Sequence, residues 1–338
     1  MIDTKYIGQE VINKRGEIGI ITKIDDNITV SFNERVCEYC DNAFSEGFLE
    51  FNDSSLKFDM QLEKCYHDLK CFDEKIKEPL EELNSLIGLD NIKSQIHELI
   101  CETKISSIRR SIGLKDPNTT KHMVFMGGPG TGKTTVARIV AKIFNALGVL
   151  SSGHVVEVDR SQLIAAYQGQ TVLKTTKVLK SALGGVLFID EAYTICRNDH
   201  DDYGYEALDT ITKFMEDHRD DLVVIAAGYS KEMIDFISAN PGLASRFKTL
   251  IYFDDYKGEE LFDIFNSFFL ANDYRLTEEA KETAQAYFRD KTCHSNARDA
   301  RNMFEKTIVK QAKRLDKKKA LTKDDLITIV KDDLFLTL

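Results

Sequence analysis

The clearest chemical signal in the chain is the segment Gly127 to Thr135, which reads GGPGTGKTT and matches the pattern G-x-x-x-x-G-K-[ST] in full. Glycines let such a loop turn its backbone N–H groups inward, where they and the positive end of a following helix bind phosphate. Lys133 is placed to reach the β and γ phosphates, and the Thr134 hydroxyl to ligate Mg²⁺. The residues expected to contact the triphosphate are Gly128, Pro129, Gly130, Thr131, Gly132, Lys133, Thr134 and Thr135.

Two carboxylates follow an apolar run further along the chain. Residues 185–191 read GVLFIDE, as expected for a central parallel strand that delivers Asp190 and Glu191 to its carboxyl end. Asp190 would hold Mg²⁺, and Glu191 would orient and polarise an attacking water. Taken alone, the run also fits a buried strand followed by an acidic helix start, but its place after a phosphate loop favours the catalytic interpretation.

The elements that must position these residues alternate between strand and helix. The apolar segments of residues 85–255 are HMVFM, HVVEV, GVLFID, LVVIAA and LIYF, and each adjoins a helical pattern such as that of Lys133 to Leu147. Such alternation predicts a mainly parallel sheet covered on both faces, so we expect an α/β core. Asp90 is a plausible N-cap for a helix before it.

Beyond Tyr256 the strand pattern stops. Residues 256–338 predict a C-terminal domain of four helices, over 259–271, 278–290, 296–315 and 323–334.

The N-terminal part follows a different period. Residues 1–55 contain short alternating β segments and resemble small SH3-like β modules, which implies a small barrel. Such a barrel either binds a partner, a peptide or nucleic acid, or serves as a structural cap. Residues 56–84 carry apolar side chains every three or four positions, which predicts a helical linker.

Composition indicates a folded, soluble protein of two or three domains. The chain has 338 residues, 43% of them hydrophobic, and no run of 18 apolar residues. Its N-terminus lacks the basic segment followed by an apolar segment that is typical of a signal peptide. Seven scattered cysteines suit a reducing compartment, so we expect a cytoplasmic location. A zinc site at Cys37 and Cys40 with Cys65 and Cys71 is an alternative use of four of them. The net charge of −10 argues against general nucleic-acid binding.

Several longer stretches together resemble the AAA+ ATPases. They are the phosphate loop continued as Thr135-Val136-Ala137-Arg138, then LFIDEAY, MEDHRDDLVVIAAGY, NPGLASRF and SNARDARNMFE. The match runs from residue 85 to 338 and is similar to the subfamily of the red-type Rubisco activase CbbX and the stage V sporulation protein K. The resemblance implies an ATPase with an AAA+ core and a helical lid.

The resemblance also implies a shared active site. Arg246, in NPGLASRF, looks like the arginine finger that enters the site of the neighbouring subunit, where a guanidinium stabilises charge on the transferring phosphoryl group. A surface ion pair is the alternative for this arginine. The family role implies a homo-oligomer, expected to be a hexamer, with little activity as a monomer.

Further residues take roles from the same resemblance. Arg298 matches the sensor-2 arginine that reaches the nucleotide from the lid, and Arg301 could share that role. Ile87 and Gly88 fit the loop that packs on adenine, which favours ATP over GTP. Most AAA+ proteins have a Thr-Asn pair where this chain has Gly228-Tyr229, as its subfamily does, so the group that replaces the asparagine stays open.

Tyr167, Gln168 and Gly169 fall where AAA+ remodelling machines carry a pore loop. An aromatic ring on a glycine-containing loop can grip extended polypeptide through apolar contacts. The leading hypothesis is therefore an ATP-driven ring that remodels or partly threads a protein client. A DNA-associated ATPase with the N-terminal barrel as reader, and a nucleotide-timed scaffold, are the alternatives.

Overall fold

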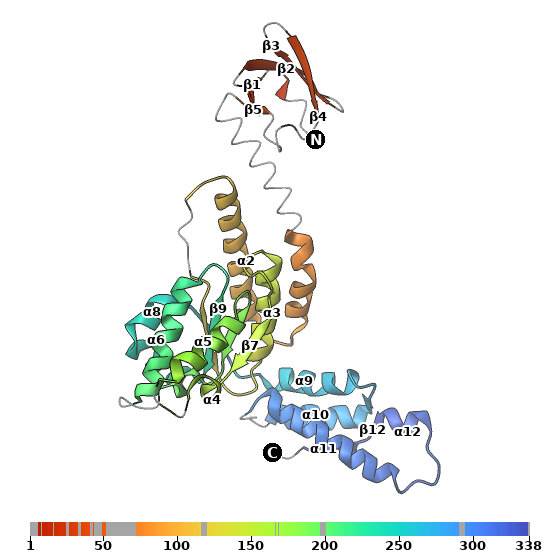
Figure 1. Ribbon diagram of the computed structural model, residues 1–338. Coiled ribbons are helices and arrows are strands. Elements are labelled where there is room, and N and C mark those ends of the chain that lie inside the picture. Colours follow the sequence, from red (N-terminus) through yellow and green to blue (C-terminus); the bar gives the residue numbers. More distant parts are fainter. Residues whose placement is uncertain are drawn as a thin grey trace. The chain divides into compact units, whose positions relative to one another are not determined.

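The computed structural model describes residues 6–7, 9–15, 17–24, 27–32, 35–40, 43, 49–51, 72–115, 120–165, 167, 169–196, 201–290 and 295–336. The chain forms two compact units (Figure 1). One comprises Met1–Glu74 with Glu102–Pro117, and the other comprises Lys75–Cys101 with Asn118–Leu338.

The first unit contains an antiparallel sheet in the order β4-β3-β2-β1-β5. The strands are β1 (Glu10–Asn13), β2 (Ile18–Ile24), β3 (Asn27–Phe32), β4 (Arg35–Cys40) and β5 (Leu49–Phe51). Burial alternates along β1, β2 and β3, so one face of the sheet forms a small core that includes Val11, Ile21 and Val30. The predicted strands in this region are present as β1, β2 and β3.

Sequence reasoning missed β4. Its residues RVCEYC mix charged and apolar side chains, so composition alone does not indicate a strand. The strand forms by pairing with β3 over all six residues. Cys37 lies on this strand and is a free thiol. Cys65 and Cys71, the other half of the zinc hypothesis, lie outside the described residues, and the part of the chain that the structure describes holds no cluster of metal-binding side chains.

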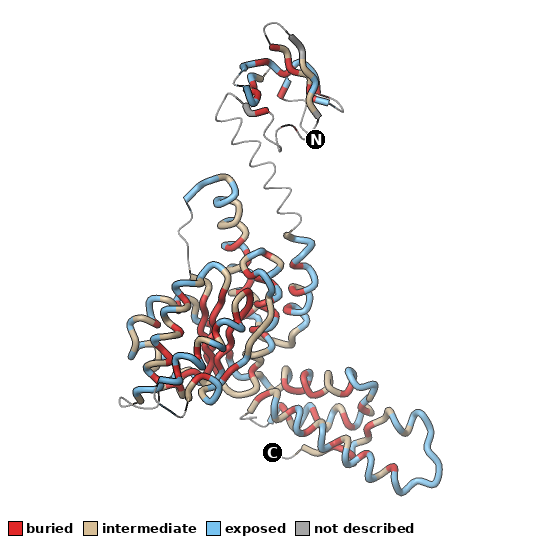
Figure 2. The backbone as a smooth tube through the Cα atoms, in the orientation of Figure 1, coloured by how far each residue is buried: buried red, intermediate tan, exposed pale blue. Residues whose placement is uncertain are grey.

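The second unit is built on a five-stranded, fully parallel sheet, as predicted. Its order is β10-β6-β9-β8-β7. The strands are β6 (Met123–Gly127), β7 (Val155–Val158), β8 (Val186–Ile189), β9 (Val223–Gly228) and β10 (Thr249–Phe253). Residues of β6, β8 and β9 are buried on both faces, as Figure 2 shows, which explains their unbroken apolar sequences.

Helices supply the cover for this sheet. They are α3 (Lys133–Ala146), α4 (Arg160–Leu163), α5 (Thr171–Ser181), α6 (Asp202–Asp217), α7 (Ser230–Ala239) and α8 (Pro241–Arg246), with the 3-10 turn η2 (Ala192–Thr194) after β8. Leu187 and Val224 point into a core formed with α5 to α8, whereas α3 lies against β7 and β8. Residues 72–85 are helical, and α2 (Asp90–Ser111) begins at Asp90 itself, one residue earlier than an N-cap at Asp90 would require.

The lid follows the sheet. Its three long helices are α9 (Gly258–Leu270), α10 (Glu278–Asp290) and α11 (Ala297–Leu315), and they enclose a core rich in phenylalanine, with Phe265 and Phe269 fully buried. Figure 1 shows these helices side by side, which agrees with their contacts. The predicted bundle is therefore present over its first three members.

The prediction of a fourth long helix was wrong. Helix α12 covers only Lys323–Ile327, and the chain continues as β12 (Thr328–Ile329), which pairs with β11 (Arg275–Leu276), and the 3-10 turn η3 (Lys331–Asp333). The Gln311 amide donates to the carbonyls of Leu326 and Thr328, each at 3.0 Å. Those carbonyls are therefore taken from the helical ladder, and the β-branched pair 328–329 favours a strand.

Among the described residues, no helix combines the length and the apolar composition that a membrane crossing requires.

Candidate nucleotide site

A cavity of about 690 Å³ lies at the carboxyl ends of the parallel strands, within the second unit. That volume is in the range of small-molecule sites, and the location is the usual one in open α/β sheets. It is lined by the phosphate loop from Pro129 to Thr135, the ends of β8 and β9, residues of the segment 85–89, and lid residues from α9 and α11.

Glycine is required at two positions of the phosphate loop. Gly130 has φ +70° and Gly132 has φ +96°, which side-chain-bearing residues rarely adopt. A Cβ on Gly130 would also lie 2.2 Å from the carbonyl oxygen of Ser295, which belongs to the lid. The loop can therefore turn this tightly, and approach the lid this closely, only without a side chain at that position.

The loop leads directly into α3, whose N-terminus faces the cavity. Gly132 is the N-cap residue, it offers no capping side chain, and the first turn of α3 holds no acidic residue. The Lys133 ammonium donates to the carbonyls of Gly127 and Gly128, at 2.9 and 2.7 Å. Burial lowers the pKa of Lys133, and Asp190 and Glu191 oppose that shift. The first-turn N–H groups and this ammonium form a positive end suited to phosphate.

Asp190 and Glu191 directly follow β8 and both line the cavity. Burial raises the pKa of Glu191, and repulsion from Asp190 adds to the effect. Glu191 has φ +49°, an uncommon conformation for a residue with a side chain, and its N–H donates to the Asp190 carboxylate at 3.1 Å. The Tyr193 hydroxyl donates a hydrogen bond to the Glu191 side-chain carboxylate.

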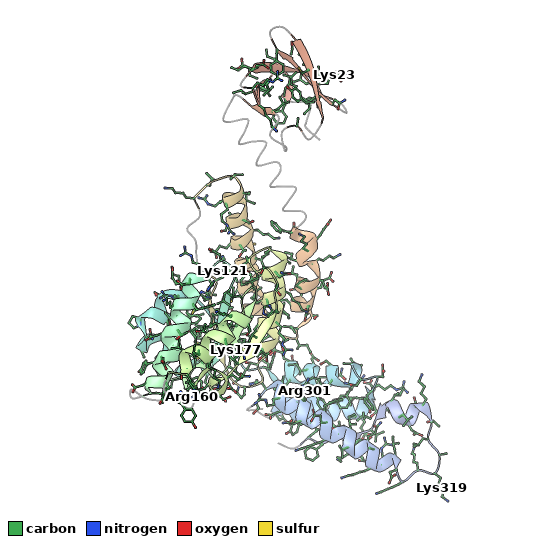
Figure 3. All side chains as sticks on the ribbon, in the orientation of Figure 1. Lys23, Lys121, Arg160, Lys177, Arg301 and Lys319 are labelled. Atoms are coloured by element: carbon green, nitrogen blue, oxygen red, sulfur yellow. The ribbon has the colours of Figure 1, made fainter. Side chains whose placement is uncertain are left out.

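Lid residues complete the cavity. Arg298 and Arg301 on α11 both line it, and the Arg301 guanidinium lies 5.3 Å from the centre of the Phe268 ring. Figure 3 shows Arg301 at the end of the lid next to the core. Ile87 also lines the cavity, together with Leu86 and Leu89, whereas Gly88 and Gly128 are not among its lining residues.

Sequence reasoning missed the polar cluster that joins loop and lid. Asn296 is fully buried, and its amide donates to Asp255 at 2.7 Å and to the Pro129 carbonyl at 3.2 Å. Its own oxygen accepts from the N–H of Tyr256 at 2.9 Å, and the Tyr256 hydroxyl reaches the Thr131 carbonyl. The motif SNARDARNMFE contains Asn296, but its partners are 40 to 167 positions away, so spacing gives no signal of them.

Arg246, at the end of α8, is not among the lining residues of the cavity in its own chain. Its Nη1 donates to the Gly242 carbonyl at 3.0 Å, and its Nη2 lies 3.4 Å from a carboxylate oxygen of Glu216. Its Nε is buried without a hydrogen-bond acceptor among the described residues. An ion pair to a half-exposed glutamate contributes little stability.

Tyr167 also lies apart from the cavity lining and is 71% exposed. Gly169 has φ +77° with open space where a Cβ would be, and Gln168 lies outside the described residues. Arg160, on α4 just before this segment, donates to the Thr194 carbonyl of η2 at 2.9 Å and to the Asp201 carboxylate at 2.7 Å. Figure 3 marks Arg160 in the core domain.

The residues around the cavity fit a nucleoside triphosphate with Mg²⁺. Glycines at positive φ, an uncapped helix N-terminus, a lysine and two arginines suit phosphate, and the Thr134 hydroxyl with the Asp190 carboxylate offers the oxygen ligands that Mg²⁺ prefers.

Comparison with known proteins supports the same conclusion. The model of the ATPase family associated with various cellular activities (AAA) matches residues 123–255, and that of the AAA lid domain matches residues 257–337. The chain is 42% identical to stage V sporulation protein K of Bacillus subtilis, over 77% of this chain and 82% of that protein. It is 42% identical to the chloroplastic ribulose bisphosphate carboxylase/oxygenase activase of Cyanidioschyzon merolae, over 77% and 91%.

Protein CbbX of Cereibacter sphaeroides is 45% identical, over 71% of this chain and 79% of that protein. A crystal structure of the FIGL-1 AAA domain in complex with ADP has a TM-score of 0.54, with 19% sequence identity over 74% of this chain and 80% of that one, so it shows the shared fold. The resemblance inferred from the motifs is confirmed. The chain therefore belongs to the AAA family of ATPases, with the lid domain of that family after its ATPase domain.

Proposed function

We propose that this ATPase works as a ring of six identical subunits that remodels a protein client. The observation that carries the proposal is the separation of Arg246 from the cavity. The other charged groups needed for phosphoryl transfer line one cavity in one chain, whereas Arg246 does not. A second copy of the chain is the natural source of the missing guanidinium.

Within the cavity each residue has a distinct proposed role. Lys133 contacts the β and γ phosphates, Thr134 and Asp190 hold Mg²⁺, and Glu191 polarises the attacking water. Mg²⁺ bound there neutralises charge that develops on the phosphates. Arg298 reaches the phosphates from the lid, with Arg301 beside it, and Ile87 and its neighbours pack on the adenine.

A protein client is the preferred substrate class for two reasons. One relative is named as an activase of another enzyme, ribulose bisphosphate carboxylase/oxygenase. Tyr167 also offers an exposed aromatic ring beside a glycine with open surroundings, which suits transient apolar contact with extended polypeptide. The β1 to β5 sheet lies outside the residues that the family models match, and we propose that it recruits a client particular to this chain.

Mixing two inactive variants tests the shared site. Arg246→Ala keeps its own pocket intact, and Glu191→Gln keeps its own Arg246. Each alone should lose at least about a hundredfold in turnover. When the two are mixed, subunits with an intact pocket receive Arg246 from the neighbour, so a substantial part of the activity should return.

Arg219→Ala is the matched control, because Arg219 also pairs with Glu216, at 3.1 Å, on the same surface. It should keep wild-type turnover. Absence of any recovery in the mixture, or full turnover by Arg246→Ala, contradicts the shared site. Turnover per subunit that stays constant on dilution below the assembly range contradicts the ring.

A further inference from the structure

The end of β9 leaves room for an aromatic ring beside the cavity. Gly228 is the last residue of β9, and a Cβ there would lie 2.8 Å from Cδ1 and 2.9 Å from Cε1 of Tyr193, and 2.9 Å from the sulfur of Met233. Carbon atoms do not approach so closely without displacement. The Tyr193 ring can therefore occupy its place only because residue 228 is glycine.

The ring is held on its other sides as well. Its centre lies 6.3 Å from that of Tyr229, with 44° between the planes, and it packs against the buried core beneath η2. Beyond it, Arg160 donates to the Thr194 carbonyl, which fixes the end of η2. These contacts give the Tyr193 side chain one defined direction.

That direction leads to the Glu191 carboxylate, to which the Tyr193 hydroxyl donates a hydrogen bond. A hydrogen bond to a charged acceptor is stronger than one between neutral groups. Glu191 also lies in the left-handed backbone region, so its side chain leaves the chain in an unusual direction and gains from a second anchor.

We propose that Tyr193 is the positioning residue of Glu191, and that Gly228 is present to admit its ring. The inference rests on the proposed role of Glu191 in polarising water. It also gives a reason for the glycine of the Gly228-Tyr229 pair, where most AAA+ proteins carry Thr-Asn. The polar contact comes from η2 in this chain, and β9 contributes the space for it.

Steady-state kinetics of Tyr193→Phe separates positioning from binding. The variant keeps the ring and loses only the hydroxyl, so kcat should fall about tenfold or more while KM for ATP and the affinity for ADP stay within about threefold. Gly228→Ala displaces the ring and should lower kcat at least as much. Tyr252→Phe, at an exposed position of β10 outside the cavity lining, is the matched control, and its kcat should stay within about twofold of wild type.

A double-mutant cycle tests the contact without turnover. Unfolding of nucleotide-free protein is measured for wild type, Tyr193→Phe, Glu191→Ala and the double variant, and the folding equilibrium constant should show coupling of at least about fivefold. Zero coupling, or unchanged kcat in Tyr193→Phe, overturns the inference. Wild-type turnover in Glu191→Gln contradicts the proposed function and removes the positioning role with it, even where the cycle still detects the contact.

Discussion

The nucleotide cavity and the surface formed by α6 and α8 differ in how their polar groups are satisfied. Around the cavity, Lys133 and Asn296 each have two or more hydrogen-bond partners in the same chain. On the α6 and α8 surface, Arg246 donates to the Gly242 carbonyl at 3.0 Å and pairs loosely with Glu216, but its buried Nε has no acceptor among the described residues. An unsatisfied buried donor costs about 1–3 kcal/mol, which a new acceptor could recover. We infer that one chain preforms nucleotide binding, whereas Arg246 is set for a different partner.

The largest expected effect tests the preformed half of this comparison. Lys133→Met should lower affinity for an ATP analogue at least about a hundredfold, since it removes charge-assisted hydrogen bonds to phosphate. Titration calorimetry on the purified protein measures the affinity. Arg246→Ala should bind with nearly wild-type affinity, because its side chain does not line the cavity.

Lys142→Met is the matched control for that prediction. Lys142 is on the same helix, is exposed, and pairs with Glu82 outside the cavity lining. Equal losses in Lys133→Met and Lys142→Met would show that the charge of α3, rather than the loop, sets the affinity. A large loss in Arg246→Ala would remove the contrast between the two regions.

The second expected effect is a pH dependence of the free energy of unfolding. It comes from His122, whose pKa is influenced by Arg246. His122 is buried, its Nδ1 accepts from the Val224 N–H at 3.0 Å, and its ring lies edge-on to Phe247. Burial lowers the pKa of His122 from 6.5 to about 4, and Arg246 contributes further in the same direction. The unfolded chain therefore binds more protons between those two pH values.

The stability that His122 contributes is thus complete above pH 6.5 and is lost as the pH falls toward 4. The loss should be about 3 kcal/mol in the free energy of unfolding. Urea unfolding at several pH values measures it. His122→Gln should flatten this slope, whereas His97→Gln, at an exposed position, should leave it unchanged. An equal slope in wild type and His122→Gln would assign the acid loss to other groups.

A smaller loss should follow from opening the polar cluster between loop and lid. Asn296→Ala leaves Asp255 and the Tyr256 N–H without their partner, so the free energy of unfolding should fall by about 2–3 kcal/mol. Chemical unfolding of nucleotide-free protein measures the change. Asn272→Ala removes an exposed amide that bonds the Phe268 carbonyl, and it should cost less than about 0.5 kcal/mol.

The two kinds of region also differ in how much of them sequence could predict. The phosphate loop and the Asp190-Glu191 pair are short continuous segments whose chemistry requires fixed neighbours. Motif spacing alone therefore predicted that both belong to one site, and both line the cavity. The parallel sheet followed from apolar runs that are buried on both faces. The first three lid helices followed from periodicity, and their bounds agree with the prediction to within one residue.

Contacts between distant segments could not be predicted. Asn296 meets Pro129 across 167 positions, and nothing in either segment indicates the other. The prediction for the end of the lid was wrong because Gln311 donates to backbone carbonyls that a longer helix would have used. That contact is a tertiary effect, which overrides local helix propensity. The Tyr193 ring lies where a Cβ on residue 228 would collide with it. The role of Gly228 can therefore be inferred only when the positions of both residues are known.

The smallest expected effect on the isolated protein concerns Tyr167. Because its ring is 71% exposed, Tyr167→Ala should change the free energy of unfolding by less than about 0.5 kcal/mol and basal ATP turnover by less than about twofold. Stimulation of turnover by a permanently unfolded polypeptide, such as reduced and carboxymethylated lactalbumin, should be lost. Leu270→Ala, which removes an apolar side chain that is 62% exposed from the lid, should keep the stimulation. If wild type is stimulated and Tyr167→Ala is stimulated as strongly, the loop does not grip the client, and the contrast between a preformed cavity and a surface awaiting partners would then depend on Arg246 alone.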